Sequence, residues 1–267
     1  MPAKVDLYDS AYANYDAEVY RQIRVETYGQ DLGQTSWVAS EESAEIPQLL
    51  GLTQASGVLE IGSGSGRYAL HLAATTGCRV LGIDINERGI HTANELAAAQ
   101  HLAERVTFEQ CDALEPLPFA NASFDAALSN DVLCHIPGRG SLLDEVFRVL
   151  KPGGRLVFSD ALVIGGVVSH REIAARSSIG YYLFSPPGEN ERLLEEAGFV
   201  ILEVRDTTTN ASAIAKRWHD AREKRAEALR QTEGAENFAG LQAFLETVHT
   251  LSKEARLLRL LYVARKP

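Results

Sequence analysis

The 267-residue sequence has little cysteine and no apolar run of about 20 residues, the length that a membrane helix needs. Its three cysteines, Cys78, Cys111 and Cys134, are odd in number and too far apart for a CxxC metal or redox site. The N-terminal residues also lack the basic flank and apolar stretch of a secretory signal. We therefore predict no disulfide scaffold, no metal site and no membrane association, and we expect a cytoplasmic protein with reduced thiols.

Positive charge is also scarce, since 26 basic residues stand against 36 acidic ones and the net charge is −10. The lysines and arginines are scattered, and their densest group, KRWHDAREKR (216–225), is interleaved with acids. A protein of this charge repels phosphate backbones. We therefore expect no nucleic-acid partner.

Short apolar stretches alternate with helical ones along much of the chain. The predicted strands cover residues 57–61, 79–84, 105–110, 124–129 and 155–160. Their mostly continuous apolar character is typical of parallel strands that are covered on both faces. An amphipathic helix is predicted over 141–150, and KPGG (151–154) ends it. The pattern predicts an α/β fold with a doubly wound, mostly parallel sheet.

A glycine-rich turn follows the first predicted strand, in GVLEIGSGSGRYALHLA (57–73). Gly62, Gly64 and Gly66 would let a ligand approach the backbone near a helix N-terminus, at the sheet edge where such folds bind ligands. Dinucleotides and S-adenosylmethionine both bind to turns of this kind, so the turn alone indicates either ligand. The dinucleotide pattern, however, needs its third glycine where Arg67 stands, and the carboxylate of Glu60 would repel a pyrophosphate.

Two further acids follow the next two predicted strands. Asp84 ends the second strand, where a carboxylate can accept hydrogen bonds from both ribose hydroxyls of either ligand. Asp112 follows the third strand, where it can accept a hydrogen bond from an adenine amino group while the amide of Ala113 meets the ring. Together with Glu60, these carboxylates favour a ligand that carries positive charge, as S-adenosylmethionine does.

Four stretches of the sequence resemble, in order and spacing, the class I S-adenosylmethionine-dependent methyltransferases. They are VLEIGSGSGRYALHLA, VLGIDIN, CDALEPLPFANASFDAALSNDVLCHI and LLDEVFRVLKPGGRLVFSD, and the match covers residues 57–160. The resemblance implies a Rossmann-like sheet of seven strands, in which the last strand is antiparallel and inserted between the fifth and the sixth. Residues 199–206 and 256–266 are the candidates for that final pair.

The N-terminal part resembles the lid helices of small-molecule N-methyltransferases such as the phosphoethanolamine and glycine-sarcosine enzymes. The resemblance implies lid helices over 1–50 and a methyltransferase core over 51–267, with helical cap insertions at about 161–188 and 210–250. In those enzymes a serine-rich turn of the lid touches the cofactor. The cofactor site implied for this chain comprises Gln34, Thr35, Ser36, Glu60, Gly62, Ser63, Gly64, Gly66, Asp84, Ile85, Cys111, Asp112, Ala113 and Asn130.

In the phosphoethanolamine enzymes a histidine in the loop after the fourth strand pairs with a tyrosine of the first helix. His135 matches that histidine, and Tyr15 is the candidate tyrosine, with Tyr20 or Tyr12 as alternatives. His135 is also the best candidate for a base or an orienting group on chemical grounds, because its unperturbed pKa is near neutral.

Four residues are candidates for contact with the acceptor. Asp160 ends the fifth predicted strand, where it either faces the substrate or caps the following loop, and aromatic residues follow it in the predicted cap. Asp131 either orients Asn130 and its loop or is solvated, and the second interpretation is favoured. The candidates are Tyr20, Asp160, Tyr181 and Tyr182.

The sequence as a whole predicts a methyltransferase that takes its methyl group from S-adenosylmethionine, releases S-adenosylhomocysteine and methylates a small molecule. The acceptor atom stays open, with nitrogen or oxygen favoured, and a homodimer is compatible with the sequence. Two alternatives remain, a protein or RNA methyltransferase and a non-catalytic nucleotide-binding protein. The acidic charge opposes an RNA substrate, and Asp112 has no role in a dinucleotide site.

Overall fold

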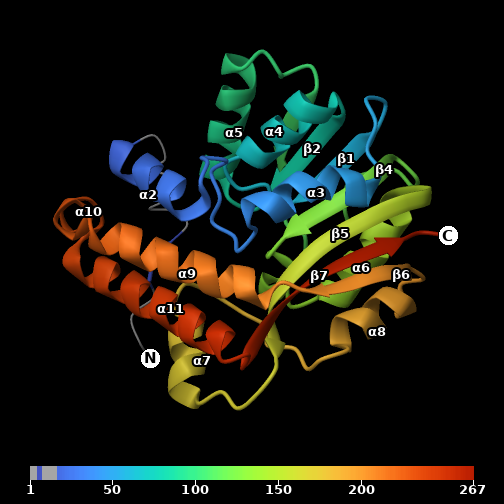
Figure 1. Cartoon of the computed structure of the whole chain (residues 1–267). Coiled ribbons are helices and arrows are strands. Elements are labelled where there is room, and N and C mark those ends of the chain that lie inside the picture. Colours follow the sequence, from blue (N-terminus) through green and yellow to red (C-terminus); the bar gives the residue numbers. More distant parts are fainter. Residues whose placement is uncertain (1–4, 8–16) are drawn as a thin grey trace.

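The computed structural model describes residues 5–7 and 17–267. A single sheet lies at its centre (Figure 1). The strands of this sheet are β1 (Gly57–Ile61), β2 (Arg79–Asp84), β3 (Val106–Gln110), β4 (Phe124–Asn130), β5 (Leu150–Ile164), β6 (Val200–Asp206) and β7 (Leu257–Arg265).

The strand order is β3-β2-β1-β4-β5-β7-β6, in a sheet of seven strands. Strands β1 to β5 pair in parallel, whereas β7 runs antiparallel to both of its neighbours, β5 and β6. The predicted α/β class and the predicted insertion of the last strand between the fifth and the sixth are confirmed. The order in which successive strands are added to the sheet reverses between β1 and β4, and this is the place where open α/β sheets bind their ligands.

Helices cover both faces of the sheet and extend beyond one end of it. They are α2 (Glu18–Tyr28), α3 (Ser40–Leu50), α4 (Arg67–Thr76), α5 (Glu87–Ala99), α6 (Arg139–Val149), α7 (His170–Arg176), α8 (Glu189–Glu196), α9 (Thr208–Glu223), α10 (Ala226–Glu233) and α11 (Ala235–Lys253), with a 3-10 turn η1 at Leu133–His135. None of the helices among the described residues is both long and apolar enough to cross a membrane.

The two faces of the sheet have separate apolar cores. Helices α3, α4 and α5 pack on one face, where Ile46 and Leu70 are buried with Val80. Helices α6 and α8 pack on the other face, where Leu142 and Leu194 are buried with strand residues. Helix α3 belongs to the predicted lid (residues 1–50), but its Ile46 is buried in the apolar core on this face of the sheet. The predicted domain boundary at residue 50 stays a prediction.

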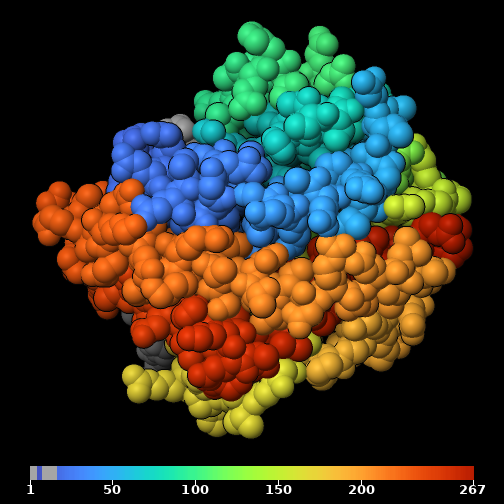
Figure 2. All heavy atoms as spheres, viewed as in Figure 1, coloured from blue at the N-terminus to red at the C-terminus, as the bar shows by residue number. Residues whose placement is uncertain are grey.

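A third apolar core joins the N-terminal helix to the C-terminal helices. Tyr28 of α2, Trp37 of the following loop, Trp218 of α9 and Phe244 of α11 pack together, with tilted ring pairs at 6.0–6.3 Å between centroids. Figure 1 shows these helices as a layer beside the sheet, with α7 next to α11. From the same side the N-terminal segment and helix α9 form one continuous surface (Figure 2). This layer covers the end of the sheet at which the glycine-rich turn lies.

The observed elements differ from the predicted ones mainly at β5. The predicted helix over 141–150 is found as Arg139–Val149, and Gly153 of the KPGG sequence has a left-handed φ of 79°. However, β5 begins at Leu150 and continues to Ile164, because Val163 and Ile164 pair with Leu258 and Leu257 of β7. The strand therefore runs four residues past its predicted end.

Candidate active site

A cavity of about 410 Å³ lies at the carboxyl ends of β1, β2 and β4, between the sheet and the helical layer. Most of the predicted site residues line it. They are Gln34, Thr35, Ser36, Glu60, Gly62, Ser63, Gly64, Asp84, Ile85, Cys111, Asp112, Ala113, Asn130, His135 and Tyr182. Residues from six separate segments of the sequence thus lie together at one end of the sheet, where a parallel sheet of this topology binds its ligand.

The glycine-rich turn is shaped by packing inside the protein. Gly62 and Gly66 have φ angles of 76° and 74°, which favour glycine. A Cβ atom on Gly62 would lie 2.3 Å from Cγ2 of Val132, and one on Gly66 would lie 2.5 Å from the side chain of Ala93. Gly66 is not among the residues that line the cavity, and its role in binding the cofactor stays a prediction. Its close neighbours are side chains of this chain.

The backbone amides of the turn are also used within the protein. The N–H groups of Gly62 and Ser63 both donate to the carbonyl oxygen of Ile83, at 2.8 and 3.0 Å, and that of Gly64 donates to Asp84. These three amides therefore have hydrogen-bond partners inside the protein. The groups of the turn that face the cavity without a partner are side-chain atoms instead.

The carboxylates of Asp84 and Asp112 accept hydrogen bonds from backbone N–H groups nearby, and both can accept further hydrogen bonds from a ligand. The carboxylate of Asp84 accepts N–H groups from Gly64 and Asn86, each at 2.8 Å, and burial raises its pKa. Asp112 accepts the N–H of Leu114 at 2.9 Å. Each carboxylate oxygen has two lone pairs, so Asp84 and Asp112 can each still accept further hydrogen bonds.

Glu60 is buried at the end of β1 and lines the cavity. Burial, and secondarily the nearby charge of Asp84, raises the pKa of its carboxyl to about 8. Its Oε2 atom has no hydrogen-bond partner among the described residues, and the same holds for Oγ of Ser63 and Oδ1 of Asn130. Buried polar atoms are nearly always paired. These three fit a ligand with several N–H donors, such as the ammonium group of S-adenosylmethionine.

His135 lies in η1 and lines the cavity. Burial lowers the pKa of its imidazole to about 4, even though the Tyr181 carbonyl acts in the opposite direction. Its Nδ1 atom is 3.0 Å from that carbonyl oxygen, which can only accept, so Nδ1 carries the proton and Nε2 is the basic nitrogen. The ring of Tyr182 lies beside the imidazole, with centroids 4.3 Å apart. The histidine is therefore neutral at physiological pH.

Three of the residues predicted to contact the acceptor lie elsewhere. Asp160 is fully buried in the middle of β5 and pairs with Arg139 at 2.7 Å, because the strand continues past it. Tyr20 is buried in the helical layer and donates its hydroxyl to Glu233 at 2.9 Å. Tyr181 is 53% exposed and does not line the cavity. The structure therefore does not place these three side chains in the cavity. The candidate tyrosines Tyr15 and Tyr12 lie outside the described residues.

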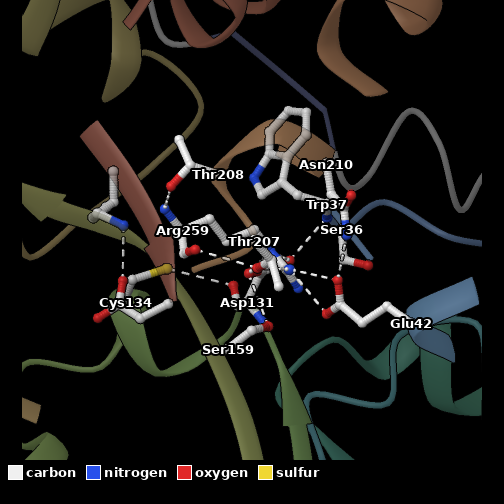
Figure 3. A network of polar contacts seen from close by, with 12 residues as sticks. Ser36, Trp37, Glu42, Asp131, Cys134, Ser159, Thr207, Thr208, Asn210 and Arg259 are labelled. Atoms are coloured by element: carbon white, nitrogen blue, oxygen red, sulfur yellow. Dashed lines mark hydrogen bonds and ion pairs between the residues drawn. The ribbon is translucent and has the colours of Figure 1, made fainter. Parts of the chain in front are cut away.

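The environment of Asp131 differs most from the predicted one. This residue lines the cavity, but it is buried rather than solvated, and it lies in a network with Arg259 of β7 (Figure 3). Its carboxylate accepts hydrogen bonds from Nε of Arg259 at 2.9 Å, from Oγ of Ser159 at 2.9 Å and from the backbone N–H of Trp37 at 2.8 Å. The guanidinium of Arg259 also donates to both oxygens of Glu42.

This network fixes the loop that carries the predicted serine-rich turn. Burial by itself would lower the pKa of the Arg259 guanidinium. The negative charges of Asp131 and Glu42 have the larger effect, so the pKa is raised. The network joins α3, β4, β5 and β7, and through Trp37 it anchors the loop at Ser36 beside the cavity (Figure 3). No local pattern of the sequence signals it, since Asp131 and Arg259 are 128 residues apart.

A second cavity residue that the sequence analysis missed is Arg176, the last residue of α7. The only signal in the sequence is its place in SHREIAARSSIGYY (169–182), where arginines and tyrosines gather. Its side chain is buried.

Comparisons with known proteins agree with this geometry. A family model described as a methyltransferase domain matches residues 59–158. The 27-O-demethylrifamycin SV methyltransferase of Amycolatopsis mediterranei is 30% identical over 271 residues, which cover 95% of each chain. An O-methyltransferase of Aspergillus sclerotiorum is 33% identical over 189 residues, which cover 68% of this chain and 70% of the relative.

Solved structures share the fold. The phosphoethanolamine N-methyltransferase 2 of Haemonchus contortus, in complex with phosphomonomethylethanolamine and S-adenosylhomocysteine, superposes with a TM-score of 0.81. It is 23% identical, and the alignment covers 97% of this chain and 60% of that one. At this identity the likeness concerns the fold alone.

Proposed function

The chain belongs to the S-adenosylmethionine-dependent methyltransferases, and we propose that it methylates a hydroxyl oxygen of a small organic molecule. The observation that carries the cofactor assignment is the acidic end of the cavity. There, the buried carboxyl of Glu60 lines the cavity with one oxygen unpartnered among the described residues, as do Ser63 and Asn130. A cationic amino-acid group satisfies such atoms, whereas a pyrophosphate would be repelled.

Each part of S-adenosylmethionine has a candidate partner in the cavity. Glu60, Ser63 and Asn130 would hold the ammonium group, and the remaining lone pairs of Asp84 would accept hydrogen bonds from the ribose hydroxyls. Asp112 would accept from the adenine amino group, with the amide of Ala113 beside the ring. Gln34, Thr35 and Ser36 line the opposite side of the cavity.

The bound donor supplies a methyl group on a sulfonium; as the acceptor oxygen bonds to its carbon, the carbon–sulfur bond breaks and S-adenosylhomocysteine remains. The residues of this chain then need only to position the acceptor, exclude water and take up its proton. His135 can perform the last task through Nε2, since its Nδ1 is held by the Tyr181 carbonyl and its low pKa keeps the ring neutral.

Two arguments favour oxygen over nitrogen as the acceptor atom. The curated relatives from Amycolatopsis mediterranei and Aspergillus sclerotiorum carry names that specify methylation of oxygen. In addition, Glu60, Asp84 and Asp112 belong to the part of the cavity assigned to the donor. Asp131 is paired with Arg259, and the part around His135 holds the cation Arg176. An ammonium acceptor would meet that cation, while an oxygen acceptor would not be repelled.

Three finer features of the protein remain proposals. The net charge of −10 supports the absence of a nucleic-acid partner, and the three free cysteines support a reducing, cytoplasmic location. A homodimer is compatible with the chain. The alternatives of a protein or RNA methyltransferase and of a non-catalytic nucleotide-binding protein are separated from the proposal by the experiment below.

The test is a methylation assay with a panel of phenols, aliphatic alcohols, amines and carboxylic acids, each incubated with the protein and S-adenosylmethionine. We expect hydroxyl compounds to gain one CH2 unit by mass spectrometry, with the new methyl group on oxygen. The variant Glu60→Gln should lose most of this activity, and Glu196→Gln, a surface change, should retain it. Methylation of amines alone would refute the choice of oxygen.

A further inference from the structure

Arg176 is a buried cation that lines the cavity. Its side chain is 1% exposed, and its Nη1 atom has no hydrogen-bond partner in the part of the chain that the structure describes. Three aromatic rings surround the guanidinium, since its Cζ atom lies 4.4 Å from the ring centroid of Tyr182, 5.1 Å from that of Phe244 and 5.9 Å from that of Trp37. Arg176 therefore sits in an aromatic cage that opens to the cavity.

The other buried arginines among the described residues are all paired with a carboxylate. Arg24 pairs with an aspartate at 2.7 Å, Arg139 does so at 2.7 Å, Arg259 meets a glutamate at 2.8 Å, and Arg222 pairs with Glu233. Arg176 has no such partner there. Aromatic faces offset only part of the cost of burying a charge. The unpaired cation thus needs an anion from outside the described part of the protein.

The cavity has charges of opposite sign on opposite sides. Glu60, Asp84 and Asp112 lie at the strand ends, where the cationic donor is assigned. Arg176 comes from α7, on the side of the helical layer, next to His135 and Tyr182. Asp131 also lines the cavity, but its carboxylate is paired with Arg259. The lining around Arg176 includes the rings of Trp37, Tyr182 and Phe244. An acceptor that is aromatic and carries negative charge on oxygen would suit it.

We propose that Arg176 binds the ionised hydroxyl of an aromatic acceptor, a phenolate or a comparable enolate, and thereby selects acidic hydroxyl compounds as substrates. The inference rests on the proposed function, because it assigns Arg176 to the acceptor of that reaction. The planar guanidinium donates to the anionic oxygen with charge-assisted hydrogen bonds, while the surrounding rings pack against the aromatic body. The cation also favours the ionised form of the hydroxyl, which is the stronger nucleophile.

The experiment measures calorimetrically the binding of two matched probes to the protein saturated with S-adenosylhomocysteine, which carries no sulfonium charge. The probes are 4-nitrophenol at about pH 9, where it is an anion, and 4-nitroanisole, its neutral methyl ether. We expect the wild-type protein to bind the anion about 10-fold or more tightly than the ether, as charge-assisted hydrogen bonds allow. Arg176→Met should remove this preference and Arg176→Lys should keep part of it.

The matched control is Arg171→Met, which removes an exposed arginine from the same helix and should leave the preference unchanged. Equal affinity of the two probes for the wild-type protein, or an undiminished preference in Arg176→Met, would overturn the assignment. The wild-type comparison decides the matter by itself if Arg176→Met does not fold. Binding of S-adenosylhomocysteine is measured first in every variant. Its absence from the wild-type protein would refute the proposed function, whereas its presence without an anion preference would refute only the role of Arg176.

Discussion

The raised pKa of Glu60 leads to a quantitative prediction for donor binding. Burial and the charge of Asp84 move the pKa of this carboxyl from 4.5 to about 8, which corresponds to several kcal/mol at about 1.4 kcal/mol per pKa unit. In the free protein at about pH 6.5 the carboxyl is therefore protonated. Binding an ammonium group favours the carboxylate, so we expect about one proton to be released for each molecule of S-adenosylmethionine bound.

The affinity for S-adenosylmethionine should depend on pH in the corresponding way. It should rise by up to about tenfold per pH unit between about pH 6 and 8, as Glu60 loses its proton more readily. Above that range it should fall again, because the α-amino group of the ligand loses its own proton near pH 8. Tyr68 and Asp84 are the other titratable groups that interact with Glu60, and the pKa of each is raised by burial.

Isothermal titration calorimetry in two buffers of different ionisation enthalpy measures this proton release directly. The variant Glu60→Gln should bind the donor more weakly and without proton release at about pH 6.5, whereas the surface variant Glu196→Gln should behave as the wild type. Proton release of equal size in Glu60→Gln, or none in the wild type, would refute the assignment of Glu60 to the ammonium group.

Other residues give three further predictions. Arg259→Met should lower the free energy of unfolding by about 3–5 kcal/mol, because it leaves buried carboxylates without a cation, and Arg192→Met on the surface should change chemical denaturation little. Gly62→Ala should cost about 1–3 kcal/mol in the same assay, since its Cβ would overlap Val132 at a left-handed φ; adding Val132→Ala should recover only the part due to overlap. His135→Ala should lower kcat by about 10²-fold or more. With saturating donor, the wild-type kcat should show no decline through pH 6.5, because the pKa of His135 is about 4; a decline there that His135→Ala abolishes would contradict this.

The elements of the sheet could be predicted because they depend on local patterns. Each predicted strand is apolar over its own length, and the left-handed glycines Gly62 and Gly66 mark the turn within a few residues. The acids Glu60 and Asp84 could be placed in the site for the same reason, since each lies at the end of a parallel strand.

The residues that could not be predicted depend on contacts between distant parts of the chain. Asp131 follows β4 as a solvated loop residue would, but Arg259 reaches it from a strand 128 residues later. Asp160 seemed to end its strand, yet pairing with β7 extends β5 to Ile164 and buries it. The aromatic cage of Arg176 is likewise formed by rings from three segments, which include Trp37 and Phe244. The spacing of residues along the sequence carries no information about contacts between such distant segments.

The central claim is that the acidic strand ends hold S-adenosylmethionine in the cavity at the end of β1. The most direct measurement is a calorimetric titration of the purified protein with S-adenosylmethionine and, in parallel, with NAD. We expect saturable binding of S-adenosylmethionine with one site per chain, loss of this binding in Asp84→Ala, and no binding of NAD. Saturable binding of NAD without binding of S-adenosylmethionine would contradict it.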